Sequence, residues 1–374
     1  MRKNILILGH NDATQFIDIY NQYTRLFDQQ YYEVTVAYLT GPENAETRQR
    51  TMAENVLFLN IPKKDIRMLK IGAIRRLLAL CREKQFQIAI CHRYKPTYIM
   101  MWVTQFYRLP ALIGVMHELG TMSSRGRQWF MAALARRNML FAGVSNAVRD
   151  DMRKDLWGIP KERVVTLYNV VDVEQTEPQF FSREEARQAL HLSADDIVFG
   201  NLARLVPNKD HASLIQAFSL IKADCPKAKL VIMGEGELAA SLQEQVRSYQ
   251  LSDDVIFTGF VANGFRYMKA FDGFVLSSIQ EAFGRVLIEA MTAKLPIIAT
   301  RVHGIPEVMG ETGLVVSPKD VVALSSAMKK IYTLSPEERG QWGKRGYQWM
   351  MENFSISSFQ KQFWQLPLMQ SLKE

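Results

Sequence analysis

The sequence has little cysteine, and its cysteines are scattered. Cys81, Cys91 and Cys225 are the only three among 374 residues. They show neither the short spacing of a metal site nor the dense pattern of a disulfide framework. The six histidines show no metal-ligand spacing either. These absences predict a protein of a reducing compartment, the cytoplasm, that needs no disulfide, no metal and no cofactor.

The sequence also lacks a long, uninterrupted apolar run. Its longest apolar region, residues 98–116, is broken by Gln105, Arg108 and Pro110, which is too interrupted for a spanning helix. The apolar run near the N-terminus is short and meets polar residues at once, so it predicts a first β-strand and not a signal sequence. We therefore expect any membrane contact to be peripheral.

Charge is unevenly distributed along the chain. The formal net charge is +8, and residues 1–175 hold 25 Lys and Arg against 16 Asp and Glu. A basic first half suggests an anionic partner, either an anionic acceptor or the inner face of the cell membrane. No nucleic-acid-binding motif accompanies the charge, so we expect no nucleic acid partner.

Short apolar runs alternate with longer amphipathic segments, a pattern that predicts an α/β fold with parallel sheets. The length favours two domains, and we expect each to be a Rossmann-like, doubly wound domain. The polar, Pro-containing segment 172–181 predicts a linker, which gives domains over residues 1–172 and 173–352 and a tail over 353–374. The expected strands are 5–8, 34–39, 56–59, 88–91, 111–116, 141–144, 164–167, 197–201, 230–233, 255–258, 273–276, 296–299 and 313–316.

Two carboxylates eight positions apart form the most informative motif. Glu281 follows a predicted strand and precedes Phe283 and Gly284, and Glu289 lies within the helix-like run that comes next. In parallel α/β sheets, ligands bind at the carboxyl ends of the strands, and the N-terminus of the following helix attracts anions. The motif predicts a phosphate-bearing ligand whose hydroxyl groups the carboxylates hold. The alternative is a helix with two solvated surface glutamates.

Two cations follow the first strand of the second domain. Arg204 and Lys209 could clamp a diphosphate, although a basic pair in a loop is often only solvated surface. Gly234 follows the next strand, where glycine permits a close backbone approach to a ligand or simply forms a turn.

In the first domain, His117 and His10 each follow a predicted strand. His117 could contact a bound sugar or serve as a structural histidine, and His10 could line an acceptor pocket. The segments 63–76 and 125–137 interleave basic with apolar residues, a pattern that suits either an interfacial helix on anionic lipid or a solvated helix face.

Read in order, these segments resemble the retaining nucleotide-sugar glycosyltransferases of family four, which have the two-domain GT-B architecture. The resemblance is dense over about residues 140–320 and thin over the first 110. The chain departs from the family pattern at Val170 and Lys294, where glycine is usual, and in the loop 9–13, which lacks paired glycines. The matching segments are 144–148, 168–172, 200–209, 233–236, 257–261, 281–289 and 303–308.

The resemblance implies two domains facing across a cleft, a tail that packs back on the first domain, and a role for each matching residue. Cations would neutralise the donor diphosphate, Glu281 would hold the transferred sugar, and His117 would reach that sugar from the first domain. The donor-binding set would be Arg204, Lys209, Gly234, Val261, Glu281, Phe283, Gly284, Val286, Leu287 and Glu289, with Gly234 and Val261 near the base, N–H groups at Val286 and Leu287, and Glu289 on the ribose.

The sequence thus predicts a metal-independent, retaining glycosyltransferase. Its substrates would be a nucleotide-diphospho-sugar, with uridine as the base, and a lipid-linked, lipopolysaccharide or other cell-envelope glycan. His117, Glu281, Arg204 and Lys209 are the expected catalytic residues. A nucleotide-sugar epimerase on the same scaffold and a non-catalytic binding protein are the alternatives.

Overall fold

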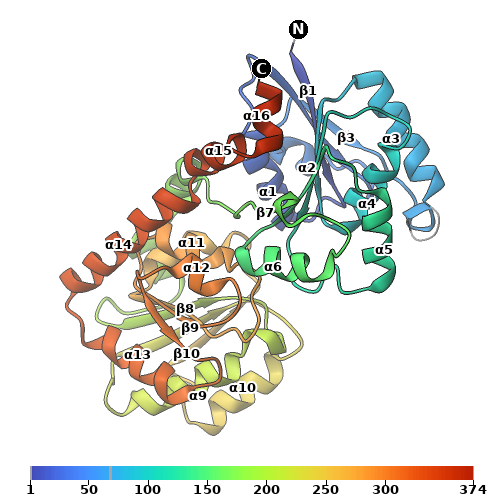
Figure 1. Ribbon diagram of the computed structural model, residues 1–374. Coiled ribbons are helices and arrows are strands. Elements are labelled where there is room, and N and C mark those ends of the chain that lie inside the picture. The colour runs from blue at the N-terminus through green and yellow to red at the C-terminus, as the bar shows by residue number, and fades with distance from the viewer. Residues whose placement is uncertain (1, 67–69, 374) are drawn as a thin grey trace. The chain divides into compact units, whose positions relative to one another are not determined.

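The structure, a computed structural model, describes residues 2–66 and 70–373 and divides into two compact units (Figure 1). The first unit comprises residues 1–169 and 356–374, and the second comprises residues 170–355. Each unit has its own parallel sheet, so the expected pair of Rossmann-like α/β domains is confirmed.

The first unit is built on a seven-stranded sheet with the order β3-β2-β1-β4-β5-β6-β7, paired in parallel throughout. Residues 5–8 and 111–113 are fully buried, because helices cover both faces of a doubly wound sheet and its strands read as continuous apolar runs. The strands are β1 (Lys3–Gly9), β2 (Tyr32–Tyr38), β3 (Asn55–Phe58), β4 (Ile88–His92), β5 (Ala111–Met116), β6 (Met139–Gly143) and β7 (Val164–Thr166).

Helices α3, α4 and α5 lie together on one side of this sheet (Figure 1). The helix expected to reach residue 137 ends at Leu134, because Ala135 adopts an extended backbone. The helices of the first unit are α1 (Thr14–Thr24), α2 (Ala45–Arg50), α3 (Ile71–Lys84), α4 (Tyr94–Val103), α5 (Arg125–Leu134), α6 (Asn146–Asp155), α15 (Ile356–Trp364) and α16 (Pro367–Lys373).

Helix α15 packs within the first unit through aromatic rings. Phe359 meets Tyr23 edge to face at 4.9 Å, and Phe363 meets Phe27 at 5.6 Å. The Trp364 indole N–H donates to the Leu26 carbonyl oxygen at 3.1 Å. The aromatic residues of the tail therefore form core contacts, and Ser355, which is extended, separates α15 from the preceding helix α14.

The second unit has a six-stranded sheet with the order β10-β9-β8-β11-β12-β13, again paired in parallel. Its strands are β8 (Ile197–Leu202), β9 (Ala228–Met233), β10 (Val255–Gly259), β11 (Gly273–Leu276), β12 (Ile297–Thr300) and β13 (Leu314–Val316). Its helices are α7 (Val173–Thr176), α8 (Arg183–Ala189), α9 (His211–Lys222), α10 (Ala239–Ser248), α11 (Arg285–Thr292), α12 (Ile305–Met309), α13 (Val321–Thr333) and α14 (Pro336–Phe354).

All thirteen expected strands are present, with ends shifted by no more than a few residues. The segment 172–181, expected to be without periodicity, contains the single turn of α7 and a 3₁₀ turn over Glu177–Gln179, which are too short to show a helical period. In the part of the chain that the structure describes, no helix is both long and apolar enough to cross a bilayer.

A buried polar pair joins α9 to the middle of the second sheet. The Asn201 amide donates to the Val275 carbonyl oxygen at 2.8 Å, and its Oδ1 lies 3.0 Å from His211 Nε2. Because Oδ1 can only accept, Nε2 of His211 carries the proton. Burial and the nearby Lys209 lower the pKa of His211 from 6.5 to about 4.

This depressed pKa predicts a loss of stability in acid. The unfolded chain binds the His211 proton more tightly, so the contribution is complete above pH 6.5 and is lost as the pH falls towards 4. The shift corresponds to about 3 kcal/mol at most. In urea denaturation at stepwise pH, we expect His211→Gln, which keeps a donor for Asn201, to flatten the fall in unfolding free energy over this range. An unchanged slope would contradict this role.

Candidate active site

Two loops of the second unit lie side by side because they follow neighbouring strands. The loop after β8 and the loop after β11 are joined where the Ile279 N–H donates to the Asn208 carbonyl oxygen at 2.9 Å. A second bond runs from the Ser277 hydroxyl to the Lys209 carbonyl oxygen, also at 2.9 Å. These bonds fix the β8 loop, which carries the predicted cations, against the β11 loop, which carries Glu281.

Lys209 and Glu281 form an ion pair between these two loops. Their side chains are only 15% and 17% exposed, so water screens the pair less than it would a surface pair. The Ser278 hydroxyl adds a 3.4 Å contact to the same carboxylate oxygen of Glu281. Arg204 lies at the start of the β8 loop and is exposed. The sequence predicted these residues separately, and the structure brings Lys209 and Glu281 together.

Gly284 begins α11 in the left-handed backbone region, with φ of +87°, which favours glycine. Phe283 is buried and meets Phe354 edge to face at 5.5 Å, which anchors the loop that carries Glu281. The Leu287 N–H donates to the Gly284 carbonyl oxygen at 2.9 Å, so this predicted anion donor already has a partner. The N–H groups of the first turn, including that of Val286, have no carbonyl one turn earlier within the helix.

The remaining predicted donor-side residues lie on α11 and on the loops after β9 and β10. Glu289 lies one turn along α11 from Arg285, with their charged groups 3.9 Å apart. Val261 follows β10, which pairs with β9, and the Gly234 N–H donates to the Gly259 carbonyl oxygen at 2.9 Å. Gly234 and Val261 therefore lie on the loops after two neighbouring strands.

Lys294, a departure from the family pattern, has a positive φ of +59° just beyond the end of α11. This backbone region explains why glycine is usual at the position. Here the Lys294 N–H donates to the Met291 carbonyl oxygen at 2.9 Å, and its ammonium lies 4.6 Å from the centre of the Tyr347 ring.

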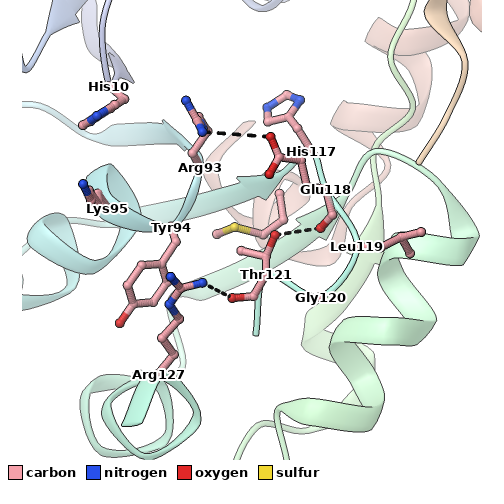
Figure 2. A pocket seen from close by; sticks show the side chains of 11 residues that line it. His10, Arg93, Tyr94, Lys95, His117, Glu118, Leu119, Gly120, Thr121 and Arg127 are labelled. Carbon is pink, nitrogen blue, oxygen red and sulfur yellow. Dashed lines mark hydrogen bonds and ion pairs between the residues drawn. The ribbon is translucent and has the colours of Figure 1, made fainter. Parts of the chain in front are cut away.

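The first unit has a pocket of about 270 Å³ at the carboxyl ends of β1, β4 and β5 (Figure 2). It brings together His10 and His117, the two histidines predicted from strand ends. Sequence reasoning missed Arg93 and Lys95, although both also follow a strand, and it singled out Arg127 only as part of the basic segment 125–137. The lining comprises His10, Arg93, Tyr94, Lys95, Met116, His117, Glu118, Leu119, Gly120, Thr121 and Arg127.

Behind His117 lies a second histidine, His92. Its Nδ1 is 3.1 Å from Nε2 of His117, and its ring is fully buried against Tyr20 and Tyr23, at 5.0 Å and 4.6 Å between ring centres. Burial, reinforced by His117, holds the pKa of His92 well below its usual value, so His92 is neutral. One ring nitrogen donates to the other, so this contact links the tautomer of His117 to that of His92. His92 lies at the end of β4. A position at a strand end is also the sequence signal that singled out His117.

No group of three or more His, Cys, Asp or Glu side chains within residues 2–66 and 70–373 is arranged to hold a metal ion.

Solved structures define the class of this fold. HepE from Anabaena, solved in complex with UDP, superposes with a TM-score of 0.79 at 19% identity, over all of both chains. The two Rossmann-like units thus form a GT-B fold.

Sequence comparison then gives the family. Residues 21–175 match the model described as Glycosyltransferase Family 4, and residues 182–349 match Glycosyl transferases group 1. The chain belongs to the GT-B glycosyltransferases of family four.

Two curated relatives illustrate the range of this family. Putative glycosyltransferase EpsF of Bacillus subtilis is 30% identical over 193 residues, which is 50% of each chain. The N-acetylgalactosamine-N,N'-diacetylbacillosaminyl-diphospho-undecaprenol 4-alpha-N-acetylgalactosaminyltransferase of Campylobacter jejuni is 26% identical over 67% of this chain and 68% of its own. The chain spans about half the length of EpsF and of several other curated relatives that it matches.

The glycine after β9 provides a test of the site's backbone. A Cβ on Gly234 would lie 2.0 Å from the Ala203 carbonyl oxygen, so the close approach that this glycine permits is to the β8 loop. Its φ of +147° is also unfavourable for other residues. We expect Gly234→Ala to lower the unfolding free energy by about 2–3 kcal/mol and to displace the loop that carries Arg204.

Gly259→Ala is the matched control, because φ there is +69° and a Cβ would meet nothing within 4 Å. This variant isolates the backbone cost of about 1 kcal/mol. Urea denaturation of both proteins makes the comparison. An equal loss of unfolding free energy in the two variants would show that the contact with Ala203 does not constrain the loop.

Proposed function

We propose that this protein is a retaining glycosyltransferase that moves a sugar from a nucleotide-diphospho-sugar to a glycan acceptor. The observation that carries the proposal is the Lys209–Glu281 ion pair at the carboxyl edge of the second sheet. Exposed Arg204 lies on the same loop as Lys209, and α11 begins four residues after Glu281. Cations and helix N–H groups suit a diphosphate, and a carboxylate suits sugar hydroxyls.

The ion pair suggests how the donor binds. A diphosphate near Lys209 would draw the ammonium away from Glu281, and the carboxylate would then accept hydrogen bonds from the sugar. Glu289 on α11 would accept bonds from the ribose. Uridine is the proposed base, supported by the UDP in the structure of HepE.

The reaction breaks the bond between the anomeric carbon and the diphosphate, and negative charge then develops on the leaving group. Arg204, Lys209 and the helix N-terminus stabilise that charge without a metal. For a retaining reaction we propose attack from the face that the diphosphate leaves, with a phosphate oxygen taking the proton of the acceptor hydroxyl. We also propose His117 as a residue that contacts the transferred sugar.

The test is calorimetric titration of the full chain with UDP, GDP and ADP. We expect UDP to bind, and Arg204→Ala to weaken its affinity about tenfold or more because a charge-assisted contact is lost. With a UDP-sugar, the turnover rate should fall on the order of 10²-fold. Arg247→Ala, which removes an exposed cation paired with Glu244 on α10, is the control.

Retention of at least a third of the wild-type rate by Arg204→Ala would refute the role of Arg204. Analysis of the products separates the alternatives, since an epimerase converts the donor sugar without any acceptor.

The acceptor that we propose is a lipid-linked or cell-envelope glycan, reached at the inner face of the cell membrane. Trp129 and Phe130 on α5 are 60% and 37% exposed, beside the exposed cations Arg125 and Arg127. Exposed aromatic and basic residues on one helix suit a surface of anionic lipid. In the other segment predicted to contact lipid, residues 67–69 lie outside the described residues.

Vesicle sedimentation tests this contact. The wild-type protein should bind vesicles that contain phosphatidylglycerol, with an affinity that falls as salt rises, and should bind pure phosphatidylcholine poorly. The double variant Trp129→Ala, Phe130→Ala should lose this binding, whereas Tyr31→Ala, which removes an aromatic ring that is 63% exposed, should keep it. Unchanged binding by the double variant would contradict the contact.

A further inference from the structure

The pocket of the first unit carries an excess of positive charge that its own residues do not balance. Three cations line it, namely Arg93, Lys95 and Arg127, against the single carboxylate of Glu118. Glu118 is 71% exposed, and its oxygen lies 3.9 Å from Arg93, so the ion pair is weak. Arg127 donates to the Thr121 carbonyl oxygen at 2.7 Å, a neutral partner.

The backbone also directs positive charge into this pocket. Arg93 has a φ of +74° as the residue that precedes α4, a strained conformation that persists where surrounding contacts hold it. Tyr94 and Lys95, the first two residues of α4, line the pocket (Figure 2). The N–H groups of the first turn of a helix favour anions and add to the three side-chain cations.

Burial and this positive charge together lower the pKa of two neighbouring groups. The pKa of His10 is lowered from 6.5 to about 4 by burial, by Lys95 and by Arg93. Burial and Lys95 also lower the pKa of Lys70. His10 is therefore neutral near pH 7, and its Nδ1 is buried without a hydrogen-bond partner among the described residues. The pocket thus combines strong positive potential with a neutral polar ring.

The dimensions of the pocket limit its ligand. A volume of about 270 Å³ is slightly below the usual range for small-molecule sites, about 300–1,000 Å³. It suits one sugar with an attached acidic group better than an oligosaccharide. Tyr94, which lies under the Arg127 guanidinium at 4.7 Å, adds an aromatic ring to the lining.

We infer that this pocket binds an acidic sugar, whose phosphate or carboxylate group is held by Arg93, Lys95 and Arg127, and that this sugar belongs to the acceptor. The second statement rests on the proposed function, because it takes the diphosphate of the donor to lie on Arg204 and Lys209 in the other unit. The pocket then selects acceptors by charge.

Binding of three probes to the full chain tests the inference. The probes are glucose 1-phosphate, glucuronate and neutral methyl α-glucoside, each titrated by calorimetry at low and high salt. We expect at least one acidic sugar to bind, with an affinity that falls with salt, and the neutral glucoside to bind about tenfold more weakly or not at all. Binding of glucose 1-phosphate alone would identify a phosphate acceptor, and binding of glucuronate alone would identify a carboxylate.

Variants locate the binding. Lys95→Ala and Arg127→Ala should each lower the affinity for the acidic probe about tenfold, as expected when a charged hydrogen-bond partner is lost. Arg108→Ala removes an exposed cation of the same unit that does not line the pocket, and it should bind the probe as the wild type does. Arg204→Ala should also leave this binding unchanged.

Three results would overturn the inference. The first is binding of the neutral glucoside with the same affinity as the acidic sugars. The second is that neither acidic sugar binds at millimolar concentration. The third is that UDP competes with the acidic sugar and that Arg204→Ala abolishes binding of the acidic sugar. Titration of UDP into the same preparation keeps the two proposals distinct. If the acidic sugars bind and UDP does not, the result counts against the nucleotide-sugar donor. If UDP binds and the acidic sugars do not, the result counts against this pocket.

Discussion

The parallel order of the strands is the constraint on which both candidate sites depend. Parallel strands end at one edge of a sheet, so residues far apart in the sequence meet there. In the second unit this brings the β8 loop against the β11 loop and allows Lys209 to pair with Glu281. In the first unit it brings the ends of β1, β4 and β5 around one basic pocket. The chemistry of each site therefore follows from strand order.

Most of the fold was predictable from the sequence because each strand is a short, buried apolar run. The strands and the two Rossmann-like sheets follow from that pattern alone. The single turn of α7 and the break at Ser355 could not be predicted from it. One turn is too short to show a helical period, and a single extended residue leaves no pattern. The positive φ of Lys294 could not be predicted either, because only a glycine would have marked that position in the sequence.

The positions of the candidate site residues after strand ends were predictable from the sequence, but the contacts between them were not. Strand ends singled out His10, His117, Lys209 and Glu281, yet which of them meet depends on strand order and loop conformation. The structure shows that Gly234 packs on the protein backbone, where sequence reasoning offered a ligand or a turn. His92 was passed over because its spacing suits no metal, whereas its contact with His117 arises only from the pairing of β4 with β5.

Hydrogen–deuterium exchange of the full chain, with and without saturating UDP, tests whether the nucleotide binds at the edge of the second sheet. We expect slower exchange in the segments that carry Arg204 and Lys209, Gly234, and Glu281 through the start of α11, with little change in the pocket of the first unit. Protection confined to the first unit, or no change in the loops after β8, β9 and β11 at saturating UDP, would contradict the placement of a nucleotide-sugar at the second sheet.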